Sequence, residues 1–238
     1  MTSKGACIVT GASQGIGRAT AIALAAKREY SSVILVSRNL EKLEETRALA
    51  GNPDNMFAVP FDLEELEGIP AMVSSVVEDH GDVDLLVNVS GYADPKPLFE
   101  TDARSLEKTF RVNVFALTLM CREVAKNMRG HRHGKIVNIA STAGSTPRPG
   151  WISYSSSKAA VISVSQTLTA ELAEYGIKVY CVSPGRCATD LRRKLAPEED
   201  PATIMQPEHV AEIIANLSGD SGNALDGQDI VVRYQPRA

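Results

Sequence analysis

The stretch ACIVTGASQGIGRA, residues 6–19, predicts a buried strand that turns sharply into a helix. Its three glycines, Gly11, Gly15 and Gly17, fall at the turn. Glycine permits a tight turn, and its missing Cβ lets backbone amides approach a pyrophosphate. The N-terminus of the following helix adds N–H donors and a positive dipole that also favour this anion. Any tight strand–helix turn uses glycine, so the triplet alone is a weak signal. At the first junction of an alternating strand–helix chain it predicts a dinucleotide site.

Strands and helices alternate from this turn to the end of the chain. Short apolar runs that predict strands occupy residues 6–11, 32–37, 56–62, 83–91, 134–141, 177–185 and 228–232. Helical patterns lie between them, for example at residues 16–28, 40–50 and 64–81. Near-continuous apolar strands are typical of a parallel sheet buried on both faces, and strand–helix–strand repeats form right-handed crossovers. The sequence therefore predicts an α/β protein with a doubly wound parallel sheet.

Composition and length predict a single domain over residues 1–238. With 44% hydrophobic and 23% charged residues, the chain has enough apolar material for a core and no compositional case for disorder. Residues 186–206 are charged, carry two prolines and break the alternation. Because loops beyond the carboxyl ends of parallel strands surround the ligand crevice, we predict that this segment is a substrate lid.

Charge and composition argue against several classes of function. A net charge of −4 argues against a general binder of nucleic acid or anionic membranes. No apolar run approaches the roughly 20 residues needed to span a bilayer, and the N-terminus lacks the long apolar region of a signal peptide. The four cysteines are scattered, and the sequence HRH at 131–133 lies in a Gly-flanked basic turn. We therefore expect a cytoplasmic protein with free thiols and no metal site.

The end of the second predicted strand indicates which cofactor binds. NAD-selective sites place a carboxylate about 20 positions after the glycine motif, where it bonds the ribose 2′-hydroxyl. The same count of about 20 from Gly17 reaches Ser37, which Arg38 follows, and no carboxylate ends this strand. A guanidinium forms a charge-assisted pair with a 2′-phosphate that a carboxylate would repel. We predict NADP(H) in preference to NAD(H); the alternative is that Arg38 is a solvated start to the next helix.

Six motifs in order give the chain a family resemblance. They are TGASQGIG at 10–17, NVSG at 88–91, Asn113 in RVNVFA, Ser141 in NIASTAG, YSSSK at 154–158 and PGRCAT at 184–189. Together they resemble the short-chain dehydrogenases/reductases in their compact one-domain form, over nearly the whole chain. The resemblance implies a seven-stranded Rossmann sheet and hydride transfer between a nicotinamide and a carbonyl or alcohol.

By this resemblance Tyr154 is the general acid or base. An ordinary phenol has a pKa near 10. The Lys158 ammonium, one helical turn away, and the cationic nicotinamide of the oxidised cofactor both favour phenolate, so we expect the pKa of the phenol to be lowered. Ser141, at the end of a predicted strand, is expected to hold the substrate oxygen as negative charge develops. By family analogy Lys158 also contacts the nicotinamide ribose, and Asn113 carries a water-mediated proton relay to Lys158.

The resemblance also assigns cofactor contacts along the chain. Asp62, beside Leu63, matches an acidic position near the adenine, and Thr189 matches the position that binds the carboxamide. The full set of expected cofactor contacts is Gly11, Ser13, Gln14, Gly15, Ile16, Gly17, Ser37, Arg38, Asp62, Leu63, Asn88, Tyr154, Lys158, Pro184, Gly185 and Thr189.

Each catalytic candidate also has a purely structural explanation. Tyr154 and Lys158 alone could be a surface pair, Ser141 could cap a turn, and Asn113 could satisfy a buried carbonyl. Their coincidence in family order favours catalysis. A catalytically silent NADP-binding regulator is the main alternative, but such a protein could lose Ser141 or Tyr154, and this chain keeps both. A sugar-nucleotide epimerase or dehydratase would need a larger C-terminal domain.

The loops expected around the site are rich in cations, which suggests a substrate class. These cations are Lys96, Arg148, Arg186, Arg192 and Arg193. An acidic protein that concentrates cations around one crevice can steer an anionic ligand. The pattern predicts a phosphorylated or carboxylated carbonyl compound as the small-molecule substrate. Alternatively, the arginines are solvated or contact the phosphates of NADP.

The helix predicted over residues 153–175 indicates an assembly. Its apolar residues fall on more than one face, at Val161, Ile162, Val164, Leu168 and Leu172. One face must pack on the sheet, so the remainder is available to another subunit. Family members commonly pair through this helix, and we expect a homodimer or homotetramer.

Overall fold

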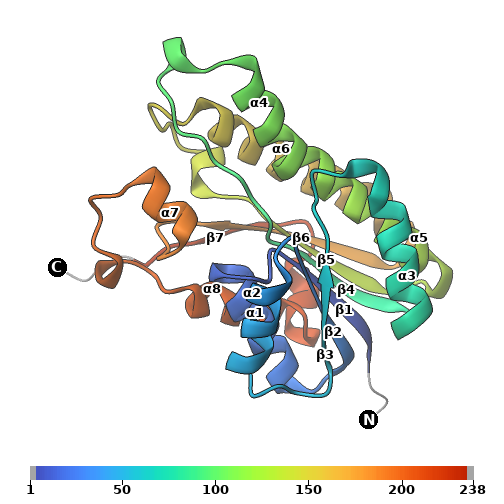
Figure 1. The fold of residues 1–238 in the computed structure, drawn as a ribbon. Coiled ribbons are helices and arrows are strands. Elements are labelled where there is room, and N and C mark those ends of the chain that lie inside the picture. The colour runs from blue at the N-terminus through green and yellow to red at the C-terminus, as the bar shows by residue number, and fades with distance from the viewer. Residues whose placement is uncertain (1–3, 235–238) are drawn as a thin grey trace.

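Seven parallel strands form one sheet in the computed structural model, which describes residues 4–234 (Figure 1). The two ends of the predicted domain, residues 1–3 and 235–238, lie outside the described part. The strands are β1 Lys4–Thr10, β2 Tyr30–Ser37, β3 Met56–Pro60, β4 Val83–Asn88, β5 Gly134–Ile139, β6 Ile177–Pro184 and β7 Asp229–Val232. Their order across the sheet is β3-β2-β1-β4-β5-β6-β7. The predicted fold class is confirmed, and predicted strand ends differ from these by at most three residues.

Helices cover both faces of the sheet (Figure 1). They are α1 Gly15–Lys27, α2 Leu40–Leu49, α3 Ile69–His80, α4 Ala103–Phe110, α5 Leu117–His131, α6 Ile152–Leu172, α7 Asp190–Leu195 and α8 Pro207–Leu217. A π-helical turn over Arg111–Ala116 joins α4 to α5. Short 3-10 segments occupy Leu66–Gly68, Leu98–Glu100, Thr142–Gly144, Ala173–Tyr175, Pro201–Thr203 and Asp220–Leu225. Helices α1, α2 and α8 lie on one side, and α3, α5 and α6 on the other.

The strands are apolar on both faces because each face packs against its own layer of helices. Ile8 of β1 belongs to the cluster that includes α3, α5 and α6 residues, whereas its neighbour Val9 belongs to the cluster that includes α1 and α8 residues. Successive side chains of a strand point to opposite faces, so two buried faces require the continuous apolar runs seen in the sequence. On α3, Ile69, Val73 and Val76 are buried against the sheet in the same way.

The carboxyl ends of the parallel strands meet at one edge of the sheet, and this edge positions the site. The chain order reverses direction at β1, which lies between β2 and β4. At this switch point Thr10 Oγ1, at the end of β1, accepts hydrogen bonds from the backbone N–H groups of Val89 (3.0 Å) and Ser90 (3.2 Å) just after β4. Ligands of open α/β sheets bind in the crevice beyond such a reversal.

None of the helices in residues 4–234 combines the length and apolar character of a bilayer span. Over the same residues, no three or more His, Cys, Asp or Glu side chains gather where they could hold a metal ion. The four cysteines, Cys7, Cys121, Cys181 and Cys187, are buried and free.

The glycine turn generates the first prediction. A Cβ on Gly17 would lie 2.2 Å from the backbone oxygen of Gly11, so Gly17→Ala must displace the turn. We expect a loss of about 1–3 kcal/mol in the free energy of unfolding, typical of overpacking, measured by urea denaturation. Gly130→Ala is the matched control, because a Cβ on this α5 glycine meets nothing within 4 Å. The control should keep or gain stability, since alanine favours helix. Equal stability of both variants would contradict this account of the turn.

Candidate active site

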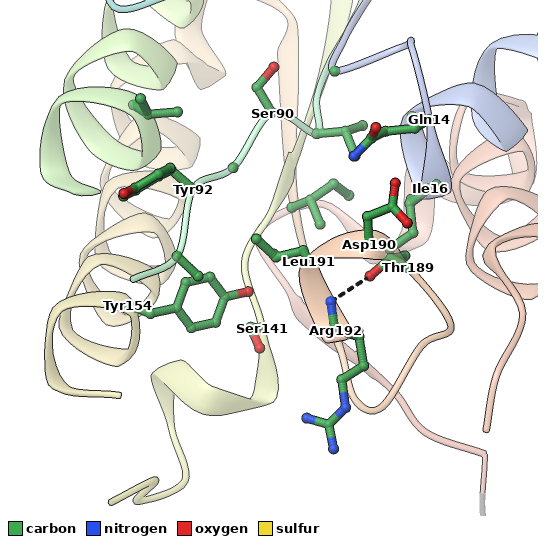
Figure 2. Close-up of a pocket in the computed structure, with 18 of the residues that line it drawn as sticks. Gln14, Ile16, Ser90, Tyr92, Ser141, Tyr154, Thr189, Asp190, Leu191 and Arg192 are labelled. Atoms are coloured by element: carbon green, nitrogen blue, oxygen red, sulfur yellow. Dashed lines mark hydrogen bonds between the residues drawn. The ribbon is translucent and has the colours of Figure 1, made fainter. Parts of the chain in front are cut away.

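A cavity of about 550 Å³ opens at the carboxyl edge of the sheet. This volume lies within the range of small-molecule sites, about 300–1,000 Å³. Its lining includes every site residue predicted from the sequence except Asn88 and Asn113. Figure 2 shows part of this lining, with the glycine-turn residues Gln14 and Ile16 on one side and Tyr154 and Ser141 on the other.

The glycine turn has the geometry of an anion cradle. Gly11 (φ 68°) and Gly15 (φ 54°) adopt left-handed conformations that favour glycine. Helix α1 begins at Gly15, and the side chain of its N-cap residue Gln14 makes no capping hydrogen bond. The first-turn N–H groups therefore face the cavity without that cap and suit a phosphate group. The residues present fit the pyrophosphate of a dinucleotide.

The far end of the cavity, beyond β2, carries hydroxyl and charged groups. Ser37 Oγ donates a hydrogen bond to Ser13 Oγ at 2.9 Å. Next to it, the Arg38 side chain is 67% exposed, and its Nη1 lies 3.9 Å from Asp62 Oδ2 and 3.7 Å from Glu64 Oε1. These separations exceed hydrogen-bond length, so the carboxylates hold the guanidinium only loosely and leave it able to meet an anion.

Tyr154 and Ser141 meet on the opposite side of the cavity. Tyr154 is buried on α6, and Figure 2 shows its hydroxyl pointing into the cavity towards Ser141. Ser141 Oγ accepts a hydrogen bond from the backbone N–H of Ala143 at 3.1 Å, and so caps the short helix after β5. The turn cap considered from the sequence is therefore real, and it holds the Ser141 hydroxyl beside the phenol.

Lys158 lies one turn further along α6, as its spacing predicted. It is buried, its Nζ donates a hydrogen bond to the backbone oxygen of Ile139 at 2.7 Å, and it stands 5.9 Å from the centroid of the Tyr154 ring. Burial lowers the pKa of the Lys158 ammonium from 10.5 to about 8. The pair is thus an interior pair, and the surface-pair explanation is wrong.

The pKa of Tyr154 differs from the expectation. Burial raises it above its ordinary value of 10.0, and hydrogen bonding with Ser141 and the charge of Arg192 oppose this rise only in part. We expected the Lys158 ammonium to lower the pKa of the phenol. The reason for the difference is that the same burial disfavours both the phenolate and the ammonium, so desolvation outweighs the local field.

Asn113 and Asn88 lie behind the cavity rather than in its lining. Asn113 sits in the π-helical turn, a feature often found at functional sites. Its amide accepts from the backbone N–H of Tyr92 (2.7 Å) and donates to the backbone oxygen of Tyr92 and to Ser157 Oγ, both at 2.9 Å. It therefore satisfies a loop backbone, and its relay role stays a prediction. Asn88 donates to Asn138 Oδ1 at 3.0 Å, and its cofactor contact also stays a prediction.

Segment 186–206 follows β6 and contributes to the lining of the cavity. Its two ends are joined by backbone hydrogen bonds from Ala188 to Met205 (2.8 Å) and from Met205 to Arg186 (3.2 Å). Between them Thr189 caps α7, accepting from the backbone N–H of Arg192 at 3.1 Å (Figure 2). Cavity-lining residues of this segment include Thr189 and Leu191.

Comparisons with known proteins agree with this geometry. The family model described as short chain dehydrogenase matches residues 5–200. The chain belongs to the short chain dehydrogenase family. It is 35% identical to the 2,3-dihydro-2,3-dihydroxybenzoate dehydrogenase of Bacillus subtilis, over 82% of this chain and 74% of that one. It is 31% identical to a 3-oxoacyl-(acyl-carrier-protein) reductase of Thermotoga maritima, over 94% of both chains.

A solved structure of a ketoreductase has the same fold as this chain. A single-substitution variant of actinorhodin polyketide ketoreductase with NADPH superposes with a TM-score of 0.89 at 28% identity, covering 97% of this chain and 96% of that one. This short chain dehydrogenase is therefore an oxidoreductase that uses a nicotinamide dinucleotide, and interconversion of a carbonyl and an alcohol is the general chemistry of its family.

The cations expected to attract an anionic substrate are largely paired in this short chain dehydrogenase. Arg192 makes two hydrogen bonds to the Glu199 carboxylate, at 2.6 and 2.9 Å, and Arg186 makes a third at 3.1 Å. The other pairs are Arg193 with Asp190 (3.3 Å) and Lys96 with Asp94 (2.9 Å) and Asp102 (3.6 Å). Arg148 lines the cavity, and no ion pair to it is found among residues 4–234.

An apolar wall beside Tyr154 was missed by the sequence reasoning. Trp151, Leu191 and Leu195 pack against a small buried cluster made of Ala93, Ala143 and Tyr154. A signal was present, because Trp151 is the single tryptophan of the chain and lies three residues before Tyr154, at the N-cap of α6. The leucines gave no such signal, since α7 is too short for a periodic pattern.

The lowered pKa of Lys158 generates the second prediction. Between pH 8 and 10.5 the unfolded chain keeps this proton while the folded chain loses it, so the lysine's effect is to raise stability as pH increases. Relative to Lys158→Met, the wild-type free energy of unfolding should therefore increase across that window, measured by urea denaturation at several pH values. Below pH 8 the difference in the free energy of unfolding between the wild type and Lys158→Met should not change with pH. A difference that stays flat between pH 8 and 10.5 would show an ordinary or raised lysine pKa.

Proposed function

We propose that the protein is an NADP(H)-dependent oxidoreductase that interconverts a carbonyl and an alcohol, with Tyr154 as general acid or base. The observation that carries the proposal is the convergence of the Tyr154 and Ser141 hydroxyls on the cavity that also contains the glycine turn. A site that binds a dinucleotide without chemistry would not need two hydroxyls aimed at a shared substrate position.

The side chains divide the work of carbonyl reduction. When bound, the reduced nicotinamide supplies the hydride. The raised pKa of Tyr154 keeps the phenol protonated at neutral pH, so it can donate its proton to the developing alkoxide oxygen. Ser141 donates a hydrogen bond to the same oxygen, and that bond strengthens as negative charge accumulates. Lys158 holds positive charge close to Tyr154, and this charge stabilises the phenolate that remains after the proton has been donated. In alcohol oxidation each proton moves in reverse.

Segment 186–206 and Asn113 have supporting roles in the proposed mechanism. Segment 186–206, joined at its base by backbone bonds, covers the substrate and excludes water from the reacting atoms. Asn113 orders the loop at Tyr92 beside Lys158: a Cβ built on Gly91 would lie 3.7 Å from both Asn113 Oδ1 and Lys158 Nζ. A relay from Lys158 through a water near Asn113 is compatible with that closeness.

Preference for NADP(H) is proposed from the residues after β2. Ser13, Ser37 and Arg38 offer two hydroxyls and a guanidinium at the position where a ribose 2′-phosphate would lie. No carboxylate ends β2, although Asp62 and Glu64 stand across from Arg38. A doubly charged phosphate competes well with such distant carboxylates.

An anionic substituent on the substrate has narrower support than the sequence suggested. Four of the five predicted cations are paired with carboxylates, so this part of the proposal rests on Arg148 at the cavity rim. The Bacillus relative is named for a ring compound that carries a carboxylate. A carboxylated carbonyl compound therefore remains within the proposed range.

Assembly and location stay predictions. Val161 of α6 belongs to the core, and the other apolar residues cited for subunit contacts, from Ile162 to Leu172, pack at its border. Apolar side chains are more exposed nearby, at Phe99, Phe115 and Ile152. We propose a homodimer or homotetramer that covers such residues, in the cytoplasm.

Replacement of Tyr154 by Phe tests the chemistry. Loss of the hydroxyl removes the proton donor, and we expect kcat for NADPH-dependent carbonyl reduction to fall by about 10²–10⁴-fold, while cofactor affinity measured by fluorescence titration stays unchanged. Tyr180→Phe is the matched control, because the Tyr180 hydroxyl is buried in β6 without a hydrogen-bond partner in the described part of the chain. Normal turnover in Tyr154→Phe would reject the mechanism, and no turnover in the wild type would favour a silent binder.

Replacement of Arg38 by Asp tests the cofactor preference. The new carboxylate repels a 2′-phosphate, so kcat/KM for NADPH should fall by about 10–100-fold, as expected for loss of a charge-assisted contact, while kcat/KM for NADH holds or rises. Arg104→Asp makes the same charge change on exposed α4, outside the cavity lining, and should leave the NADPH/NADH ratio unaltered. An unchanged ratio in Arg38→Asp would assign the preference elsewhere.

A further inference from the structure

The wall next to Tyr154 differs in chemistry from the rest of the cavity. Elsewhere the lining is rich in hydroxyls, charges and backbone amides, whereas Trp151, Leu191 and Leu195 form an apolar wall around the catalytic phenol. Ala93 and Ala143 complete it, and both are nearly inaccessible to solvent. These side chains do not belong to the two main cores of the sheet. Leucine and tryptophan at a cavity surface are costly to leave in water, which indicates an apolar occupant.

The tryptophan of this wall is held in place from two sides. Its ring meets the Tyr154 ring edge-on, with centroids 6.3 Å apart and planes at 76°. The Arg192 guanidinium lies over the same indole, 5.6 Å from the ring centroid. Glu199 fixes that guanidinium through two hydrogen bonds. A preorganised aromatic surface of this kind favours binding because no side chain must be ordered when the ligand arrives.

The same contacts reduce the positive charge at the wall. The charge of Arg192 acts on the Tyr154 phenol, and the Glu199 carboxylate, which Arg192 shares with Arg186, offsets that charge in part. A substrate anion placed here would have to displace Glu199 from Arg192, which offers no net gain in ion pairing. Arg148, on the loop before Trp151, and Lys194, between Leu191 and Leu195, also line the cavity; both are exposed to solvent, and no ion pair to either is found among residues 4–234.

We propose that this wall is a substrate subsite for an apolar ring or branched alkyl group attached directly to the reacting carbonyl. The inference rests on the proposed function and narrows it. The ring packs against Trp151, Leu191 and Leu195, with its carbonyl oxygen directed to the Tyr154 and Ser141 hydroxyls. Any charged substituent projects away from the wall, towards solvent near Arg148. Small hydroxylated or phosphorylated ketones bury polar groups against this wall without partners and are disfavoured.

A ketone series tests the subsite. We expect kcat/KM for cyclohexanone to exceed that for acetone by at least about 100-fold, because each methylene in an apolar pocket contributes about tenfold or more. Dihydroxyacetone phosphate should fall below acetone. Leu195→Asn should reduce the cyclohexanone/acetone ratio by at least about tenfold. Leu98→Asn makes the same change at an exposed position outside the cavity lining and should preserve the ratio.

Fluorescence gives a readout that needs no turnover. Trp151 is the only tryptophan of the chain, so its emission reports directly on this wall. With NADP⁺ present, which cannot reduce a ketone, cyclohexanone should shift the emission to the blue by displacing water, and dihydroxyacetone phosphate should not. Equal kcat/KM for cyclohexanone and dihydroxyacetone phosphate, or no response of Trp151 to cyclohexanone, would overturn the subsite. Either result leaves the proposed function intact if Tyr154→Phe still abolishes reduction of the better substrate.

Discussion

The hydrogen bond from the Lys158 ammonium to the Ile139 carbonyl ties the longest helix of the protein to the end of a central strand. Both groups are buried, so neither can exchange this partner for water without a large cost. Together with the packing of Val161 in the core, the bond holds the face of α6 that carries Tyr154 against the end of β5. Gly144 strengthens the constraint, since a Cβ there would lie 2.8 Å from the Lys158 backbone, and only glycine lets α6 approach this closely.

Burial then sets the electrostatics of the site. The environment that raises the Tyr154 pKa also lowers the Lys158 pKa, because each charged form loses its hydration. The phenol is therefore protonated at neutral pH, and the ammonium loses its proton more readily than that of an exposed lysine. In the proposed mechanism such a pair suits proton transfer, since neither group is locked in one charge state by a strong partner. Ser141 contributes by bonding the phenol, and its own position comes from the turn that it caps.

The parts of the fold that the sequence predicts are those with a local cause. Buried parallel strands require apolar runs, and the glycine turn requires residues that tolerate positive φ, so both are visible in a single stretch of chain. The raised pKa of Tyr154 was not predictable, because i,i+4 spacing reports which residues are close and says nothing about how deeply they are buried. The position of Asn113 in a π-helical turn has no sequence signal either, although a polar residue among apolar neighbours marked the place.

The lid shows why counting charges misleads. From the sequence, its arginines looked like an anion receptor. In the fold, Glu199 binds both Arg186 and Arg192, and the outcome is an internal clamp that presents an aromatic and aliphatic surface to the cavity. A cation whose hydrogen bonds are already satisfied attracts an anion weakly, whereas its flat guanidinium still stacks on tryptophan. The arginine therefore shapes the substrate site by positioning Trp151, and its charge acts mainly within the lid.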